Sequence, residues 1–115
     1  YPERHTMSLS PLIILCTCPD RTTAERIAET VVSERLAACV NIAPGLTSIY
    51  RWEGQIQREA ELLLLIKTRQ AVYPQLEARI RELHPYQVPE LIALPIQAGS
   101  AAYLDWIADS TRASA

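Results

Sequence analysis

Several features that mark large classes of proteins are missing from this sequence. No run of 18 or more apolar residues occurs, so we expect no membrane-spanning helix. The first residues also lack the basic, apolar and small-residue pattern of a secretory signal. Phenylalanine is absent, Lys67 is the only lysine, and the formal net charge is -2. Domains that bind nucleic acid usually carry clustered basic residues or aromatic strand motifs, so we expect no nucleic-acid partner.

Cysteine is scarce as well. The three cysteines are an odd number, and none of them forms a Cys-x-x-Cys pair. This pattern favours reduced thiols over a disulfide framework, and it predicts a cytoplasmic protein.

The length of 115 residues, with 49% apolar and 21% charged residues, fits one globular domain. We assign residues 7–115 to this domain. Residues 1–6 precede the only methionine, Met7, and we interpret them as a tag remnant or a disordered N-terminal extension.

The hydrophobic periodicity predicts an order of strands and helices. Short apolar runs predict the strands, and a spacing of three to four residues predicts the helices. The sequence Thr22-Thr23-Ala24-Glu25 resembles a capping box that begins the first helix, Glu53-Gly54 resembles the tip of a hairpin, and Ser100 is expected to cap a short last helix. The predicted elements are a strand at 12–16, a helix from Thr22, a hairpin spanning 39–68, a helix at 72–83, a strand at 91–96 and a helix after Ser100.

The order β-α-β-β-α-β with a short C-terminal helix predicts an α+β, ferredoxin-like domain with its helices on one face of the sheet. Three strands, at 12–15, 62–66 and 91–94, are nevertheless apolar on both faces. The uncovered face therefore needs another cover, and a second copy of the chain is the simplest one. The alternative is that the C-terminal helix covers that face, but eight to ten residues, at about 1.5 Å each, are too few. On this reasoning Leu64→Glu is expected to prevent assembly.

Six segments resemble the CutA divalent-cation-tolerance family, in order, from about Leu12 to Ile107. They are Cys16-Thr17-Cys18-Pro19, Leu36-Ala37-Ala38-Cys39-Val40-Asn41, Ser48-x-Tyr50-x-Trp52-x-Gly54, Glu61 through Ile66-Lys67-Thr68, His84-Pro85-Tyr86-x-Val88-Pro89-Glu90 and Tyr103-Leu104-x-Trp106-Ile107. The resemblance implies a ferredoxin-like protomer, a homotrimer, a likeness to PII signalling proteins, a cytosolic location and a link to copper and other divalent metals.

The resemblance also marks Cys16 and the histidine of the His-Pro-Tyr motif, His84, as metal ligands. Thiolate and imidazole suit copper, and Glu61 is a further candidate ligand. Some family members have two adjacent histidines, whereas here Leu83 precedes His84. The structural alternatives are a buried Cys16 that packs as a small apolar side chain and a His84 that stabilises the carbonyls at a helix end.

A second candidate site is a cleft between subunits that binds an anion, as the PII likeness suggests. Its candidate residues are Lys67, Trp52, Tyr86 and Trp106. The alternatives are an ion pair of Lys67 with Glu59 or Glu61 and aromatic side chains that anchor an interface.

The sequence therefore favours a trimeric divalent-cation tolerance protein that binds copper or another divalent metal or signals in response to it, and not an enzyme. One alternative is a PII-like interaction module that senses a small molecule or anion, with a protein partner that the sequence does not identify. The other is an enzyme with Cys16 as nucleophile and His84 as base, which would require a lowered thiol pKa.

Overall fold

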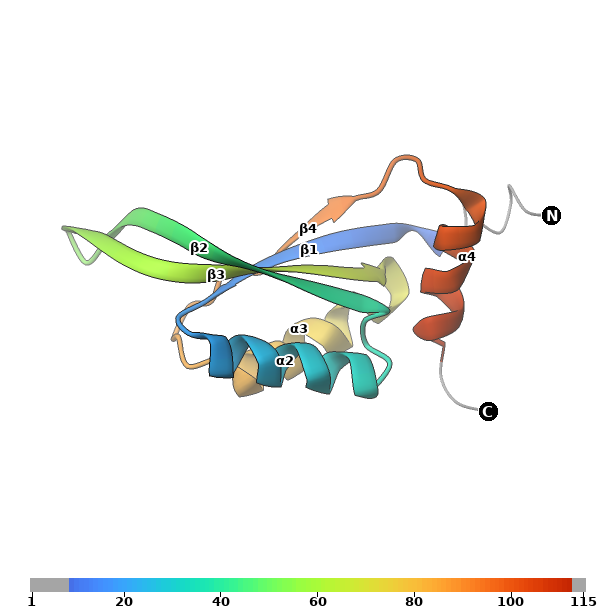
Figure 1. Cartoon of the computed structure of the whole chain (residues 1–115), viewed down its shortest axis with the longest axis horizontal. Helices are drawn as coiled ribbons and strands as arrows, with labels where there is room; N and C mark the ends of the chain where they lie inside the picture. Colours follow the sequence, from blue (N-terminus) through green and yellow to red (C-terminus); the bar gives the residue numbers. More distant parts are fainter. Residues whose placement is uncertain (1–8, 113–115) are drawn as a thin grey trace.

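The computed structural model describes residues 9–112, which form an antiparallel sheet with two helices packed on one face (Figure 1). The elements are β1 (Pro11–Cys18), α2 (Arg21–Ser33), β2 (Cys39–Trp52), β3 (Gln55–Arg69), a 3-10 turn η1 (Gln70–Val72), α3 (Tyr73–Leu83), β4 (Ile92–Pro95) and α4 (Ala101–Ser110). The strand order is β2-β3-β1-β4, all neighbours antiparallel. The predicted α+β, ferredoxin-like order with a last helix is confirmed. The interpretation of residues 1–6 concerns positions outside the described range.

The hairpin of β2 and β3 forms a long arm that extends beyond the helices (Figure 1). Its tip lies at Glu53 and Gly54, as predicted, and both residues have left-handed backbone with φ of 50° and 78°. Such a pair matches the twist of the two strands it joins. A bulge between Ala43 and Leu46 shifts the register of the arm, with Gly45 at φ 85°.

Polar side chains cap two of the helices. Asp20 caps α2, because its Oδ1 accepts a hydrogen bond from the Thr23 backbone N–H at 2.7 Å. The predicted capping box starting at Thr22 is therefore wrong, and the cap lies two residues earlier. Ser100 caps α4 as predicted, with its Oγ 3.2 Å from the Tyr103 N–H.

The two faces of the sheet differ in what covers them. On one face Ile14, Leu64 and Ile66 are fully buried in a core with Ile27 of α2 and Ile80 of α3. Because side chains alternate along a strand, the residues between them point to the other face. This opposite face is the open face of the sheet, and β4, which pairs with β1 at the edge of the sheet, has four exposed residues.

Helix α4 packs at one end of the sheet instead of covering this open face (Figure 1). It forms a small cluster that includes Leu104 and Ile107 with Leu9, Ala38 and Ile96. Ile92 and Leu94 of β4 remain 50% and 48% exposed. The alternative in which the last helix covers the open face is thus excluded within one chain. In residues 9–112, no helix has the length and apolar character needed to cross a membrane.

Candidate metal centre and the adjoining cleft

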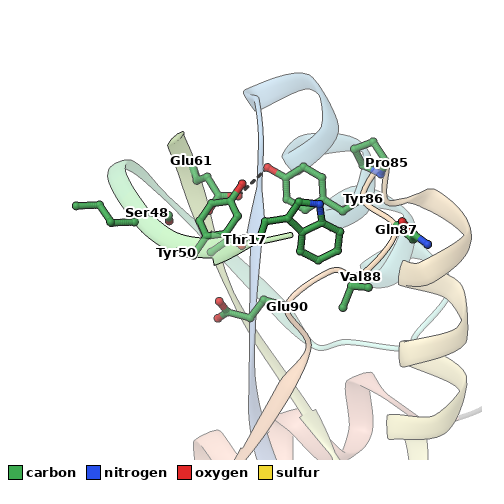
Figure 2. Close-up of a pocket in the computed structure, with 11 residues that line it drawn as sticks. Thr17, Ser48, Tyr50, Glu61, Pro85, Tyr86, Gln87, Val88 and Glu90 are labelled. Carbon is green, nitrogen blue, oxygen red and sulfur yellow. Dashed lines mark hydrogen bonds between the residues drawn. The ribbon is translucent and has the colours of Figure 1, made fainter. Parts of the chain in front are cut away.

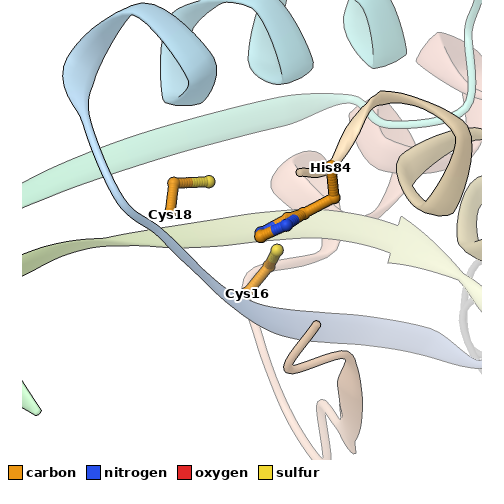
Figure 3. Close-up of side chains that lie close together, drawn as sticks. All are labelled: Cys16, Cys18 and His84. Carbon is orange, nitrogen blue, oxygen red and sulfur yellow. The ribbon is translucent and has the colours of Figure 1, made fainter. Parts of the chain in front are cut away.

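Three potential metal ligands meet on the helix-covered face of the sheet. Strand β1 continues through Cys18, so the side chains of Cys16 and Cys18, two residues apart, lie on the same face. His84 follows α3 and brings its ring to the same place, and Figure 3 shows it pointing toward the two cysteine side chains. One ligand atom from each residue lies within 4.8 Å of the other two. Both cysteines are 0% exposed, and His84 is 7% exposed.

Two backbone groups fix the orientation of the His84 ring. Its Nε2 lies 2.7 Å from the carbonyl oxygen of Thr17, and its Nδ1 lies 3.2 Å from the backbone N–H of Tyr86. In neutral imidazole the Nε2–H therefore donates to Thr17 and Nδ1 accepts from Tyr86. The structural alternative placed the His84 ring on the carbonyls at the end of α3. The ring bonds to Thr17 and Tyr86 instead. A carbonyl that holds one ring nitrogen in this way is a common support for a histidine that binds a metal through the other nitrogen.

The pKa values of the two thiols are shifted in opposite directions. A hydrogen bond between them, together with burial, raises the pKa of the Cys16 thiol well above its usual range. The same hydrogen bond, helped by His84 against the effect of burial, lowers the pKa of Cys18 to about 6. Burial opposes a charged His84, but its hydrogen bonds to Cys18 and Thr17 outweigh that effect and raise the pKa of His84. Cys18 is therefore the thiolate of the pair.

This arrangement suits a soft cation. Two sulfur atoms and one imidazole nitrogen are donors that copper(I) and zinc prefer. A structural zinc site normally has four protein ligands, and the described residues supply three here. Cys16, the candidate nucleophile, is fully buried and has a raised pKa, whereas the enzyme hypothesis required a lowered one.

Sequence reasoning missed Cys18. The Cys-x-Cys spacing was visible in the sequence, but Pro19 made it uncertain that the strand would continue far enough to align the two side chains. Glu61, the further candidate ligand, does not belong to the group of Cys16, Cys18 and His84. Its Oε2 instead accepts a hydrogen bond from the hydroxyl of Tyr86 at 2.7 Å.

That hydrogen bond lies in a cleft of about 700 Å³ between the hairpin arm and the segment after α3 (Figure 2). The cleft is lined by residues from β1, the arm and this segment, namely Thr17, Ser48, Ile49, Tyr50, Trp52, Glu61, Pro85, Tyr86, Gln87, Val88 and Glu90.

Of the four candidate cleft residues, the structure brings Trp52 and Tyr86 together in this cleft and places the other two elsewhere. Lys67 donates a hydrogen bond to the side-chain oxygen of Asn41, and Trp106 packs on Tyr103 of α4 with ring centroids 5.4 Å apart. Among the described residues, Lys67 makes no ion pair with Glu59 or Glu61.

Comparison with known proteins identifies the family. The sequence profile described as CutA1 divalent ion tolerance protein matches residues 12–110. The chain belongs to the CutA1 family. A divalent-cation tolerance protein CutA from Thermus thermophilus is 54% identical over 99 residues, which are 86% of this chain and 96% of that protein. A chloroplastic CutA 1 protein from Oryza sativa is 44% identical over 97% of this chain, but the matched part is only 63% of the rice protein.

Solved CutA1 structures share the fold. The divalent cation tolerance protein from Thermus thermophilus superposes with a TM-score of 0.87 and 52% identity, covering 89% of this chain and 99% of that chain. CutA from Xylella fastidiosa gives a TM-score of 0.88 and 43% identity, covering 90% of this chain and 99% of that one. The family is named for tolerance of divalent cations and not for an enzymatic activity, which agrees with an interaction with metal ions.

Proposed function

We propose that the chain is a homotrimeric, cytoplasmic cation tolerance protein that binds copper as copper(I) at Cys16, Cys18 and His84. One observation carries the proposal: three soft or borderline donors from two distant parts of the chain lie within 4.8 Å of one another. Thiolate sulfur selects copper(I) over hard cations such as magnesium and calcium, which need several oxygen ligands.

The protonation of the site supports this assignment. Cys18 has a pKa of about 6 and is available as a thiolate at neutral pH, so one ligand needs no deprotonation. Cys16 must lose its proton when metal binds, because its pKa is raised. The Thr17 carbonyl and the Tyr86 N–H already hold the His84 ring beside the two cysteines. The thiols must stay reduced for this chemistry, which supports a cytoplasmic location.

The open face of the sheet supports the trimer. Apolar residues of β4 remain about half exposed, and no helix of the described chain covers them. A monomer rarely exposes a contiguous apolar face of this kind, so contact with further copies of the chain is the simplest explanation.

The test is a copper(I) titration in competition with a chromophoric chelator. Cys16→Ser, Cys18→Ser and His84→Ala should each weaken binding by about tenfold or more, whereas Cys39→Ser, which alters the one cysteine outside the cluster, should bind like the wild type. Equal binding by the wild type and the three cluster variants would reject the site. A loss with Cys39→Ser alone would place copper elsewhere.

A further inference from the structure

The cleft beside the metal centre carries negative charge that no basic side chain balances. Its lining includes Glu61 and Glu90 but no lysine, arginine or histidine among the described residues. Glu61 is only 7% exposed, and within residues 9–112 its one hydrogen-bond partner is the neutral Tyr86 hydroxyl. A buried carboxylate without a cationic partner is costly, so this cleft favours a positively charged ligand. The charge of the favoured ligand is therefore opposite to that of the anion that the sequence suggested.

Aromatic side chains form much of the same cleft. Tyr50 and Trp52 come from the arm, and Tyr86 comes from the segment after α3. Figure 2 shows Tyr50, Glu61 and Tyr86 close together, with the hydrogen bond between Tyr86 and Glu61 drawn as a dashed line. The faces of aromatic rings attract organic cations, most strongly where water is partly excluded. Carboxylate and aromatic groups together therefore define the chemistry of the ligand.

A bare metal ion fits this cleft poorly. The described residues contain one group of three or more potential metal ligands, and that group is the cysteine and histidine cluster on the other face of β1. One oxygen of Glu61 is already used by Tyr86. A volume of about 700 Å³ is instead within the range of sites for small organic molecules.

We propose that this cleft is a binding site for a small organic ammonium ion, with the charged nitrogen held by Glu61 and enclosed by the rings of Tyr50, Trp52 and Tyr86. The apolar part of the ligand would lie against Ile49 and Val88, which line the cleft and are 60% and 67% exposed. This activity goes beyond copper binding and uses different side chains.

The experiment compares three probes of the same length on the assembled wild-type protein, namely n-butylammonium, n-butanol and butyrate. Trp52 lies in the cleft, so its fluorescence reports occupancy, and calorimetry gives the affinity. The ammonium should bind at least about tenfold more tightly than the alcohol, because only the cation gains the carboxylate and ring interactions. Butyrate should bind most weakly. Equal affinities for ammonium and alcohol, or tighter binding of butyrate, would overturn the proposal.

Variants locate the site. Glu61→Gln should remove the preference for ammonium over alcohol, and Trp52→Leu should weaken ammonium binding while leaving the carboxylate in place. Glu29→Gln, on the exposed surface of α2, is the matched control and should behave like the wild type. Copper(I) affinity is measured on the same samples, since it should survive Trp52→Leu and be lost in Cys16→Ser. Absence of ammonium binding to the wild type would show that the cleft is closed or filled by another copy of the chain, and would reject the site while leaving copper binding intact.

Discussion

Leu94→Glu is expected to break the proposed trimer while sparing the core of the protomer. Leu94 lies on β4 and pairs with Ile13 of β1 on the open face of the sheet. It is 48% exposed in the single chain, whereas Leu64, on the covered face, is 0% exposed. A charge at Leu94 therefore falls in the proposed contact between copies, and a charge at Leu64 falls between the sheet and its helices. Leu64→Glu should also prevent assembly, as the sequence predicts, but it would do so by unfolding the protomer and therefore does not test the contact separately.

The size of the effect follows from the exposure of this side chain. Burying a whole leucine stabilises by about 1.5 to 3 kcal/mol, so the exposed half of Leu94 contributes roughly 1 kcal/mol at the contact. A carboxyl group buried there without a partner would take up a proton, and burying the neutral group costs roughly 2 kcal/mol more. Threefold symmetry repeats both effects, which gives roughly 9 kcal/mol per trimer, or about six powers of ten in the association constant.

Light scattering after size-exclusion chromatography measures the outcome. The wild type should have a mass near three times 12.9 kDa at low micromolar concentration, and Leu94→Glu should have the mass of one chain with its helical circular dichroism retained. Val32→Glu is the matched control, since Val32 is 40% exposed but lies on α2, away from the open face. A monomeric wild type, a trimeric Leu94→Glu, or equal dissociation of both variants would refute the reasoning.

Three further predictions concern stability and pH. Leu64→Ala should lower the free energy of unfolding by about 3 to 5 kcal/mol, measured by chemical denaturation, because a fully buried side chain leaves a cavity; a loss under about 1 kcal/mol would contradict the packing. Tyr86→Phe should cost about 1 to 3 kcal/mol in the same assay, because it leaves the buried Glu61 carboxylate without its hydrogen bond, and an unchanged midpoint would show that water replaces it. Copper(I) affinity should fall by about tenfold for each pH unit on acidification from pH 8, because the raised pKa of Cys16 means that its proton must leave on binding. The fall should steepen first where His84, whose pKa is raised above its usual value, takes up a proton, and again below about pH 6, where Cys18 does so, and a flat profile would remove Cys16 from the site.

Local sequence patterns were sufficient to predict the elements and their order. Hydrophobic periodicity identifies helices and strands because each must bury one face or stripe, and Pro74 and Pro85 mark the ends of α3 through their restricted backbone. Glu53 and Gly54 mark the hairpin tip because a tight turn there needs left-handed backbone. The cap of α2 was misplaced by two residues, since Asp20 and Thr22 are both good caps and only the backbone path selects between them.

The sequence by itself determined the α+β fold, the excess of apolar strand residues and two of the three members of the candidate metal centre. The tertiary structure decided which residues meet. Cys18 joins Cys16 and His84 because β1 runs straight through Pro11–Cys18, a fact that residue spacing alone leaves open. The cleft is acidic because the fold brings Glu61 and Glu90 beside Trp52 and Tyr86 and leaves Lys67 bonded to Asn41. Charge and ligand geometry depend on distances across the sheet, and those are set by strand register and helix packing, not by separation along the chain.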